Sequence, residues 1–216
     1  MSGMAYSAYI DAIGADSERV EIQLFDSGKP LFEQDRKHDA AFLICLGAVI
    51  VSRLMEDGRR SVSRFALAGD VVGFSVFERE RFSAHALLPV EAIRIDLTAE
   101  GSLDTASPPR LSRLLKRAGS ELDGAYAMMM TLGRKRADER LASFLIDLAD
   151  RWREAHGPVR EIPFPMTWRD IADHLGLTIE TVSRNMTILH KRKLIAVHTH
   201  RYEILDRAGL AELAKV

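Results

Sequence analysis

The sequence predicts an α+β protein: an N-terminal β-barrel of the jelly-roll type, a long dimerisation helix and a C-terminal winged helix-turn-helix. Three observations support this prediction. Turn signals recur at regular intervals over residues 19–97, apolar residues follow a heptad pattern over 111–132, and two short capped helices precede a hairpin pattern within 166–205. The expected domains are 1–107 for the barrel, 108–136 for the dimerisation helix and 137–216 for the winged helix-turn-helix.

Composition is that of an ordinary globular protein, with 47% hydrophobic and 28% charged residues in a chain of 216. We expect a cytoplasmic protein with no membrane partner, because there is neither an apolar run of about 18 residues nor a signal-peptide pattern. The net charge is −1, yet residues 151–216 contain 11 Lys and Arg against 8 Asp and Glu. This local excess is compatible with a surface that faces phosphates.

Cys45 is the single cysteine, and it lies inside the apolar run 41–46. We expect a buried structural thiol, with a reactive sensor thiol as the alternative. One cysteine excludes an intramolecular disulfide, and an iron–sulfur cluster held by cysteines needs about four thiolates.

The barrel is predicted from β-rich runs separated by turn signals. The runs are 48–54, 61–65 and 92–95, and the turn signals are 26–30, 46–47, 56–58 and 68–70. The residues around Asp57 and Gly58 predict a β-hairpin. Many short strands at regular spacing are typical of a sandwich or a small barrel.

The predicted dimerisation helix begins after Ser107, at two prolines that favour helix entry. Its apolar residues alternate at spacings of four and three, which is the pattern of a coiled-coil contact and predicts a parallel homodimer. An amphipathic helix that packs on its own domain is the alternative. The residues are Leu111, Leu115, Ala118, Leu122, Ala125, Met129 and Leu132. A further helix is expected over 137–154, ended by Gly157.

The helix-turn-helix is predicted over residues 166–189. Thr167 is suited to cap the first helix, with Asp170 completing a capping box. Gly176 is placed where a left-handed residue would end that helix, and Thr178 is placed to cap the second. Two short helices joined by a turn that contains glycine are the helix-turn-helix arrangement.

The second helix of this motif has two different faces. Val182, Met186 and Leu189 should pack on the domain. The opposite face carries Glu180, Ser183, Arg184 and Thr187. A guanidinium, a carboxylate and a hydroxyl on one face suit base edges in a major groove, because arginine pairs with guanine and glutamate accepts from cytosine. The alternative is a solvated face with a Glu180–Arg184 ion pair.

Residues 194–205 predict two strands around a polar tip, which is a wing. Four basic residues around it could meet phosphates: Lys191, Arg192, Lys193 and Arg201. His198 and His200 lack a third ligand nearby, so we expect no metal site there.

With these motifs in place, the chain resembles the CRP/FNR superfamily of bacterial transcription regulators. The resemblance runs through the barrel motifs and is most specific at LTIETVSR. These segments are 28–32, 47–49, 56–59, 65–73 and 177–184. The resemblance implies a cyclic-nucleotide-binding-like barrel, a homodimer on a palindromic operator, and RNA polymerase as a partner.

The same comparison indicates the FNR/FixK-like branch, since cyclic-AMP receptors carry arginine where this chain has Ile179. Each half-site should then be similar to TTGAY, with Ile179 suited to a thymine methyl. The expected DNA-binding residues are Thr178, Ile179, Glu180, Ser183, Arg184, Thr187, Lys191 and Arg201.

The barrel departs from nucleotide-binding members of the family at two places. Phe74 follows Gly73 where the family has glutamate, and Phe82 precedes Ser83 where it has arginine, although Arg81 is adjacent and could partly substitute. This argues against cyclic AMP, so no cofactor is expected. Haem stays open as an alternative, with His38 and His85 as candidate ligands.

The sequence therefore predicts a homodimeric transcription regulator, expected to be an activator. A receptor that signals through protein contacts is a second class. The face with Glu180, Ser183 and Arg184 argues against it, because these side chains suit base edges. An enzyme is a third class, and the chain shows no phosphate-binding glycine loop, nucleophile elbow or paired metal-ligand motif.

Overall fold

The structure is a computed structural model that describes residues 21–75, 77–96 and 108–215. Within the helix that begins at Pro108, the side chains of 108–111, 113, 114, 117 and 118 lie outside the described set. The chain divides into two compact units. The first contains the described residues up to Arg59 together with 63–96 and 108–126, and the second contains Arg60–Val62 and the residues from Ala127 onward.

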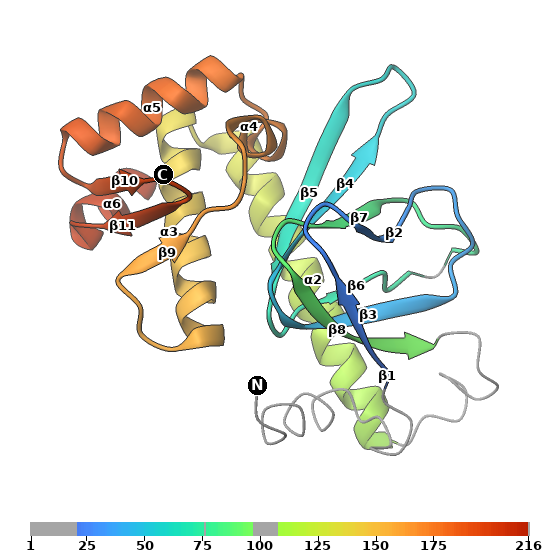
Figure 1. Cartoon of the computed structure of the whole chain (residues 1–216). Coiled ribbons are helices and arrows are strands. Elements are labelled where there is room, and N and C mark those ends of the chain that lie inside the picture. Colours follow the sequence, from blue (N-terminus) through green and yellow to red (C-terminus); the bar gives the residue numbers. More distant parts are fainter. Residues whose placement is uncertain (1–20, 76, 97–107, 216) are drawn as a thin grey trace. The chain divides into compact units, whose positions relative to one another are not determined.

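Strands make up the described residues from Glu21 to Asp96, as Figure 1 shows, and all but the first three residues of β5 belong to the first unit. They are β1 (Glu21–Phe25), β2 (Pro30–Phe32), β3 (Ala40–Leu46), β4 (Ala48–Leu54), β5 (Arg60–Leu67), β6 (Val71–Val72), β7 (Ser83–Ala86) and β8 (Val90–Asp96). One sheet has the order β1-β8-β3-β6 and the other has the order β2-β7-β4-β5. Neighbouring strands such as β3 and β8 pair antiparallel. The expected α+β class and N-terminal β-barrel are confirmed.

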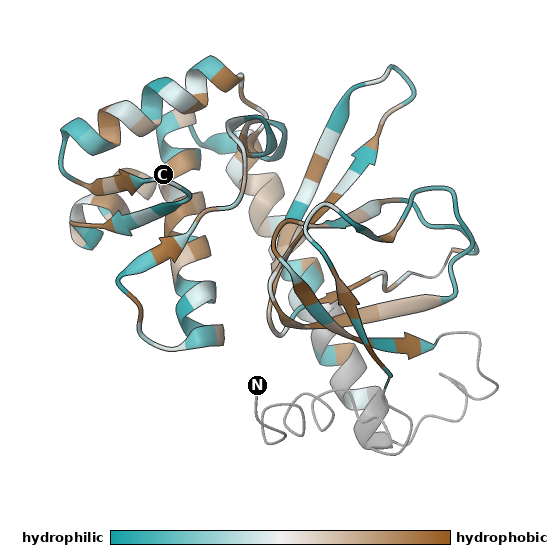
Figure 2. Cartoon of the chain, viewed as in Figure 1, coloured by the Kyte–Doolittle hydropathy of each residue, from teal (hydrophilic) through white to brown (hydrophobic). Residues whose placement is uncertain are grey.

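The core of this unit follows from the two-residue period of its strands. In β3, Ala40, Phe42 and Ile44 point into one hydrophobic cluster. The Phe42 ring meets Phe25 edge-on at 5.7 Å and stacks with Phe32 at 6.3 Å between ring centroids. Hydrophobic stretches along these strands are visible in Figure 2.

The turn at Gly47 shows why a glycine is required there. Gly47 has φ +97°, a left-handed conformation, and an added Cβ would lie 2.3 Å from the Pro89 carbonyl oxygen. The predicted hairpin turn is also present, since the Met55 N–H donates to the Arg59 carbonyl at 2.8 Å. Predicted run 48–54 is β4, while 61–65 and 92–95 are parts of the longer strands β5 and β8. The sequence did not predict the short strands β2 and β7.

Helix α2 (Pro108–Arg134) has 27 residues and is the predicted long helix. The second unit continues with α3 (Ala137–His156), β9 (Glu161–Pro163), α4 (Trp168–Leu175), α5 (Ile179–Lys191), β10 (Ile195–His198), β11 (Arg201–Ile204) and α6 (Arg207–Ala214). Its small sheet has the order β10-β11-β9. The third strand, β9, and the terminal helix α6 were not predicted. No described helix has the length and apolar character needed to cross a membrane.

The apolar face of α3 organises the second unit. Its buried residues include Leu141, Phe144, Leu145, Leu148 and Trp152. Tyr202 of β11 is fully buried and donates its hydroxyl hydrogen to the Leu145 carbonyl at 2.5 Å. Helix α6 packs on α3, where Arg207 forms two 2.8 Å contacts with the Asp150 carboxylate. This framework supports α4, α5 and the hairpin β10–β11.

Cys45 gives a first test of the barrel core. The side chain is 1% exposed, and burial raises the pKa of its thiol to about 11. A hydrogen bond from the Ile93 backbone lowers this pKa, but by less than burial raises it. At pH 8 only about 0.1% of such a thiol is ionised, against roughly a quarter of an ordinary cysteine. We expect a chromogenic disulfide reagent to label the native protein at least about 100-fold more slowly than the urea-unfolded chain. Labelling at equal rates would instead support a reactive sensor thiol.

Candidate DNA-binding surface

Helix α4 begins with the predicted capping box. The Thr167 hydroxyl oxygen accepts from the Asp170 backbone N–H at 3.1 Å. One Asp170 carboxylate oxygen accepts in return from the Thr167 N–H at 2.8 Å and from its hydroxyl at 2.6 Å. The first N–H groups of a helix have no partner within the helix, so this exchange satisfies groups that would otherwise need water. The cap fixes where α4 starts.

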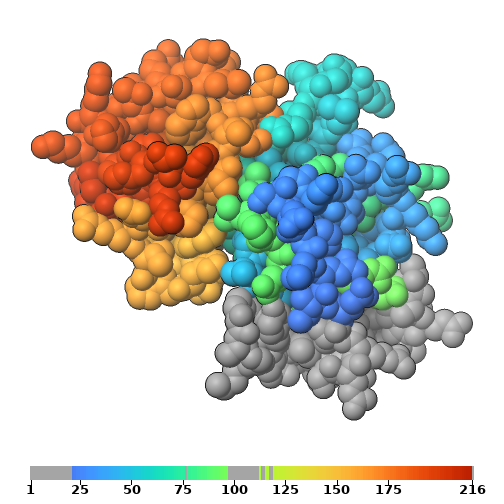
Figure 3. All heavy atoms as spheres, in the orientation of Figure 1, coloured from blue at the N-terminus to red at the C-terminus, as the bar shows by residue number. Residues whose placement is uncertain are grey.

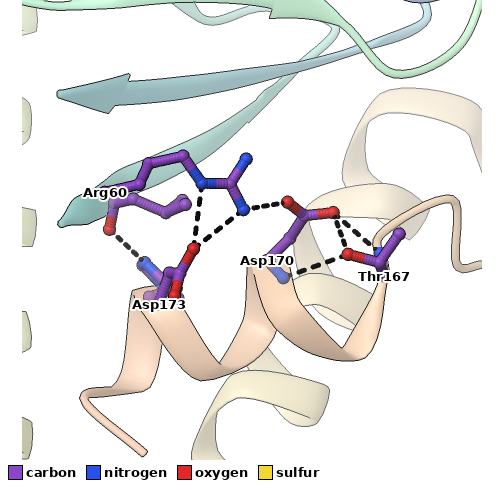
Figure 4. A network of polar contacts seen from close by, with 6 residues as sticks. Arg60, Thr167, Asp170 and Asp173 are labelled. Atoms are coloured by element: carbon purple, nitrogen blue, oxygen red, sulfur yellow. Dashed lines mark hydrogen bonds and ion pairs between the residues drawn. The ribbon is translucent and has the colours of Figure 1, made fainter. Parts of the chain in front are cut away.

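A distant segment of the chain completes this cap. Arg60 donates from Nη2 to the second Asp170 oxygen at 2.5 Å and from Nε to Asp173 at 2.9 Å (Figure 4). In the same segment, the Val62 carbonyl accepts from His174 Nδ1 at 3.1 Å. Residues 60–62 therefore pack with the C-terminal unit, although more than 100 positions separate Arg60 from Asp170. No sequence signal identified Arg60.

These partners stabilise the ionised form of the Asp170 carboxyl group. Burial alone would raise the pKa of the Asp170 carboxyl, but the hydrogen bonds from Thr167 and the Arg60 guanidinium outweigh burial and lower that pKa below its ordinary value. Asp170 is 6% exposed, so the ionised carboxylate depends on these contacts rather than on water.

The turn between α4 and α5 is the predicted one. Gly176 has φ 62° and ψ 43°, and its N–H donates to the Ala172 carbonyl. Leu177 N–H reaches the same carbonyl at 3.0 Å. Thr178 then caps α5 by accepting from the Thr181 N–H at 3.2 Å. Both predicted caps and the left-handed glycine are confirmed.

Helix α5 presents the two predicted faces. Val182, Met186 and Leu189 are at most 3% exposed and pack on the unit. The opposite side is exposed and carries Glu180, Ser183, Arg184 and Thr187, with Ile179 36% exposed beside them. Figure 3 shows atoms of the C-terminal residues, in orange to red, at the surface of the face that is drawn. The structure thus brings the expected base-contacting residues together on one open face.

The side chains on this face are available for a ligand. Within the described residues, Arg184 makes no hydrogen bond or ion pair, so the alternative Glu180–Arg184 pair does not form. The pKa of Glu180 is lowered by its own backbone N–H and by the Thr178 hydroxyl, which keeps the carboxylate ionised. Asn185 is buried and was not singled out by the sequence. It donates from Nδ2 to the Thr181 carbonyl at 3.0 Å, within the same helix and away from the exposed face.

The wing is the β10–β11 hairpin, which pairs His198 with Arg201 and leaves Thr199 and His200 as its turn. His200 adopts φ 55°, so it supplies the left-handed conformation that glycine often provides. Exposed basic side chains surround it: Lys191, Arg192, Lys193 and Arg201. Arg201 has a long 3.5 Å contact to Glu161. The described residues contain no cluster of three or more metal-ligand side chains.

In the barrel, two of the residues considered for ligands contact other side chains, although the buried His38 Nε2 has no hydrogen-bond partner among the described residues. Arg81 lies over the Phe77 ring, 4.2 Å from its centroid. His38 and Glu80 are both buried and lie 2.6 Å apart between Nδ1 and Oε1. His85 is half-buried in β7. Arg81, which could partly substitute for the family's phosphate-binding arginine, is exposed and contacts the Phe77 ring.

The predicted dimer residues of α2 are exposed wherever their side chains are described. Leu115, Leu122, Met129 and Leu132 are 64%, 52%, 60% and 37% exposed, and Ala125 is also exposed. We call these five residues the α2 stripe. Leu111 and Ala118 have side chains outside the described set. Such exposure argues against the alternative in which this face packs on its own domain.

Comparisons with known proteins agree with this geometry. Residues 139–213 match the Crp-like helix-turn-helix domain. The chain is 36% identical over 192 residues to the nitrogen fixation regulation protein FixK of Azorhizobium caulinodans, covering 88% of this chain and 77% of that protein. It is 31% identical over 191 residues to the fumarate and nitrate reduction regulatory protein of Vibrio cholerae, covering 88% and 76%. The structure of FixK2 from Bradyrhizobium japonicum superposes with a TM-score of 0.83 at 27% identity, covering 91% and 98%.

The Asp170 network predicts a pH-dependent stability. An Asp170→Asn variant should lower the free energy of unfolding of the C-terminal unit by about 1–3 kcal/mol at pH 7, because it removes charge-assisted hydrogen bonds. The folded pKa is lowered, so this contribution is full above the ordinary aspartate pKa of about 4 and is lost as the pH falls through the folded value. Fluorescence-monitored urea unfolding reports on this unit, because both tryptophans, Trp152 and Trp168, belong to it.

The matched control is Asp147→Asn, which removes only an exposed i,i+4 contact with Arg151. Its effect should stay below about 0.5 kcal/mol at all pH values. A difference between wild type and Asp170→Asn that is the same at pH 3 and pH 7 would contradict the assigned network.

Proposed function

The chain belongs to the CRP/FNR family of DNA-binding transcription regulators, in its FixK-like branch, and on that premise we propose that it acts as a homodimer on a palindromic operator with TTGAY-type half-sites. One observation carries the proposal. Arg184 stands exposed and without a protein partner among the described residues, on the same face of α5 as Glu180 and Ser183.

Each group on this face has a base edge that it suits. Arg184 can donate two hydrogen bonds to O6 and N7 of guanine, and the ionised Glu180 can accept from N4 of cytosine. Ile179 is apolar and partly exposed, which suits a thymine methyl. Each good bidentate pair contributes about 1–3 kcal/mol of discrimination between bases. These contacts would read a TTGAY-like half-site.

Phosphate contacts would come from the edges of the same surface. Thr187 lies farther along the exposed face of α5, Lys191 ends that helix, and Arg201 begins β11, the second strand of the wing. Thr178 contributes as the cap that sets the first turn of α5. Contacts to phosphates orient the protein and supply affinity, but they carry no sequence information directly.

Dimerisation through the α2 stripe would provide the second recognition helix. Two copies of α5 must lie about 34 Å apart to enter successive major grooves on one side of the DNA. A two-fold symmetric protein would then match a palindromic operator. We further propose RNA polymerase as the partner and activation as the output, since relatives include the transcriptional activator protein FnrA of Stutzerimonas stutzeri.

The proposed regulator works in the cytoplasm, where its DNA is, and uses neither cyclic AMP nor an iron–sulfur cluster. The single cysteine, which is buried, and Phe74 and Phe82 at the places of the family's glutamate and arginine support this part of the proposal. Control would then come from another ligand of the barrel or from the abundance of the protein.

Base recognition is tested by fluorescence anisotropy on a TTGAT–N4–ATCAA duplex and a scrambled duplex at one salt concentration. Wild type should prefer the palindrome, and Arg184→Ala should reduce that preference by about tenfold or more, because a bidentate base contact is lost. Lys191→Ala is the control and should weaken both duplexes to a similar degree. An Arg184→Ala protein that keeps the full preference would contradict the assigned base contact.

Dimerisation is tested by replacing Leu122 and Met129 with Glu together and measuring mass by sedimentation equilibrium. Like charges in an apolar contact are destabilising, so the double variant should be monomeric at concentrations where wild type is dimeric, and operator binding should be lost. The control places the same charges at Ser120 and Ala127, which are exposed but lie opposite the stripe in the heptad. A dimeric, operator-binding Leu122→Glu/Met129→Glu protein would show that α2 associates differently.

A further inference from the structure

Arg140 makes three hydrogen bonds to backbone carbonyls from one guanidinium. Nε donates to Lys135 O at 2.8 Å, Nη1 to Leu175 O at 3.0 Å and Nη2 to Leu132 O at 2.6 Å. The residue is half-buried in the first part of α3, four positions after the N-cap Arg136. None of its partners among the described residues is a carboxylate, so these contacts are not a surface ion pair.

The three carbonyls belong to different elements of the C-terminal unit. Leu132 is in the last turn of α2, Lys135 is in the two-residue link to α3, and Leu175 is the last residue of α4. The final carbonyls of a helix have no partner within the helix and carry a partial negative charge. A planar guanidinium with donors in a fixed fork can serve several of them at once, which a lysine ammonium on a flexible stem cannot do in the same geometry.

The turn of the helix-turn-helix lies against this same group. A Cβ built on Gly176 would be 3.6 Å from Arg140 Nη1 and 3.7 Å from the Leu132 side chain. Thr178, two residues later, caps α5. The start of the recognition helix is therefore tied through Leu175 and Gly176 to the last turn of α2.

We propose that Arg140 is a positioning residue that fixes the α4–α5 turn on the last turn of α2 and so sets the operator spacing that the dimer accepts. This inference rests on the proposed function, because it requires a dimer formed through α2. The place of each recognition helix relative to the symmetry axis then depends on how the turn is attached to α2. Spacing is a sensitive reporter, since one added base pair moves a half-site by about 3.4 Å and turns it by roughly 35°.

The experiment measures the affinity of the full chain for duplexes whose two half-sites are separated by three, four or five base pairs. Wild type, Arg140→Lys and Arg207→Lys are compared. Arg140→Lys keeps the charge, so the slope of affinity against salt should not change. The ratio of affinities between the preferred and the neighbouring spacings should fall at least about threefold, because the attachment of the turn loosens.

Arg207→Lys is the matched control. It also breaks a two-bond arginine contact to α3, at Asp150, and this pair does not involve α2 or the turn. Its spacing ratio should equal that of wild type. A loss of stability alone would lower the active fraction for every duplex equally and leave the ratio unchanged.

A second variant keeps the test decisive if Arg140→Lys does not fold. Gly176→Asn retains a residue that tolerates the left-handed conformation and places a side chain against the Arg140 guanidinium. It should also flatten the spacing ratio. Unchanged ratios in the folded variants, with a wild type that prefers the palindrome, would overturn the role of Arg140 alone. A wild type without preference for the palindrome would overturn the proposed function and this inference with it.

Discussion

The need to satisfy backbone groups at the two ends of α4 governs the geometry of the whole recognition surface. A helix of eight residues has too few internal hydrogen bonds to hold itself, since its first N–H groups and last carbonyls lack partners. Thr167 and Asp170 close the first end, and Gly176 with Arg140 closes the other. Because α5 follows after a short turn, the direction of its exposed face depends on these contacts.

Two arginines that lie outside the exposed face of α5 contact opposite ends of α4. Arg60 binds carboxylates at the start and along the first turns, while Arg140 binds the carbonyl at the end. As an isolated charge, a cation is unfavourable near the N-terminus of a helix and favourable near its C-terminus. Arg60 is tolerated near the positive end because Asp170 and Asp173 lie between, and Arg140 is favoured at the negative end.

The same chain keeps its apolar residues in two different roles. In the barrel and on α3 they are buried, as with Ile44 and Leu145, and their burial supplies the stability of each unit. On α2 they remain exposed, as with Leu122 and Met129, and we propose that this apolar surface contacts a second copy. Under that proposal, the apolar residues that stabilise each unit and those that join two copies lie in different parts of the sequence.

The sequence by itself determined the class of the fold, the long helix, the two capped helices of the motif, and the two faces of α5, since these follow from local caps and from periods of two and 3.6 residues. The sequence did not predict short strands such as β2 and β9, because three residues are too few to show a two-residue period. Only the tertiary structure brought Arg60 to Asp170 and Arg140 to Leu132 and Leu175. The reason is physical: an arginine that donates to a distant carboxylate or to main-chain carbonyls leaves no spacing in the sequence, because its partners are set by packing rather than by neighbouring residues.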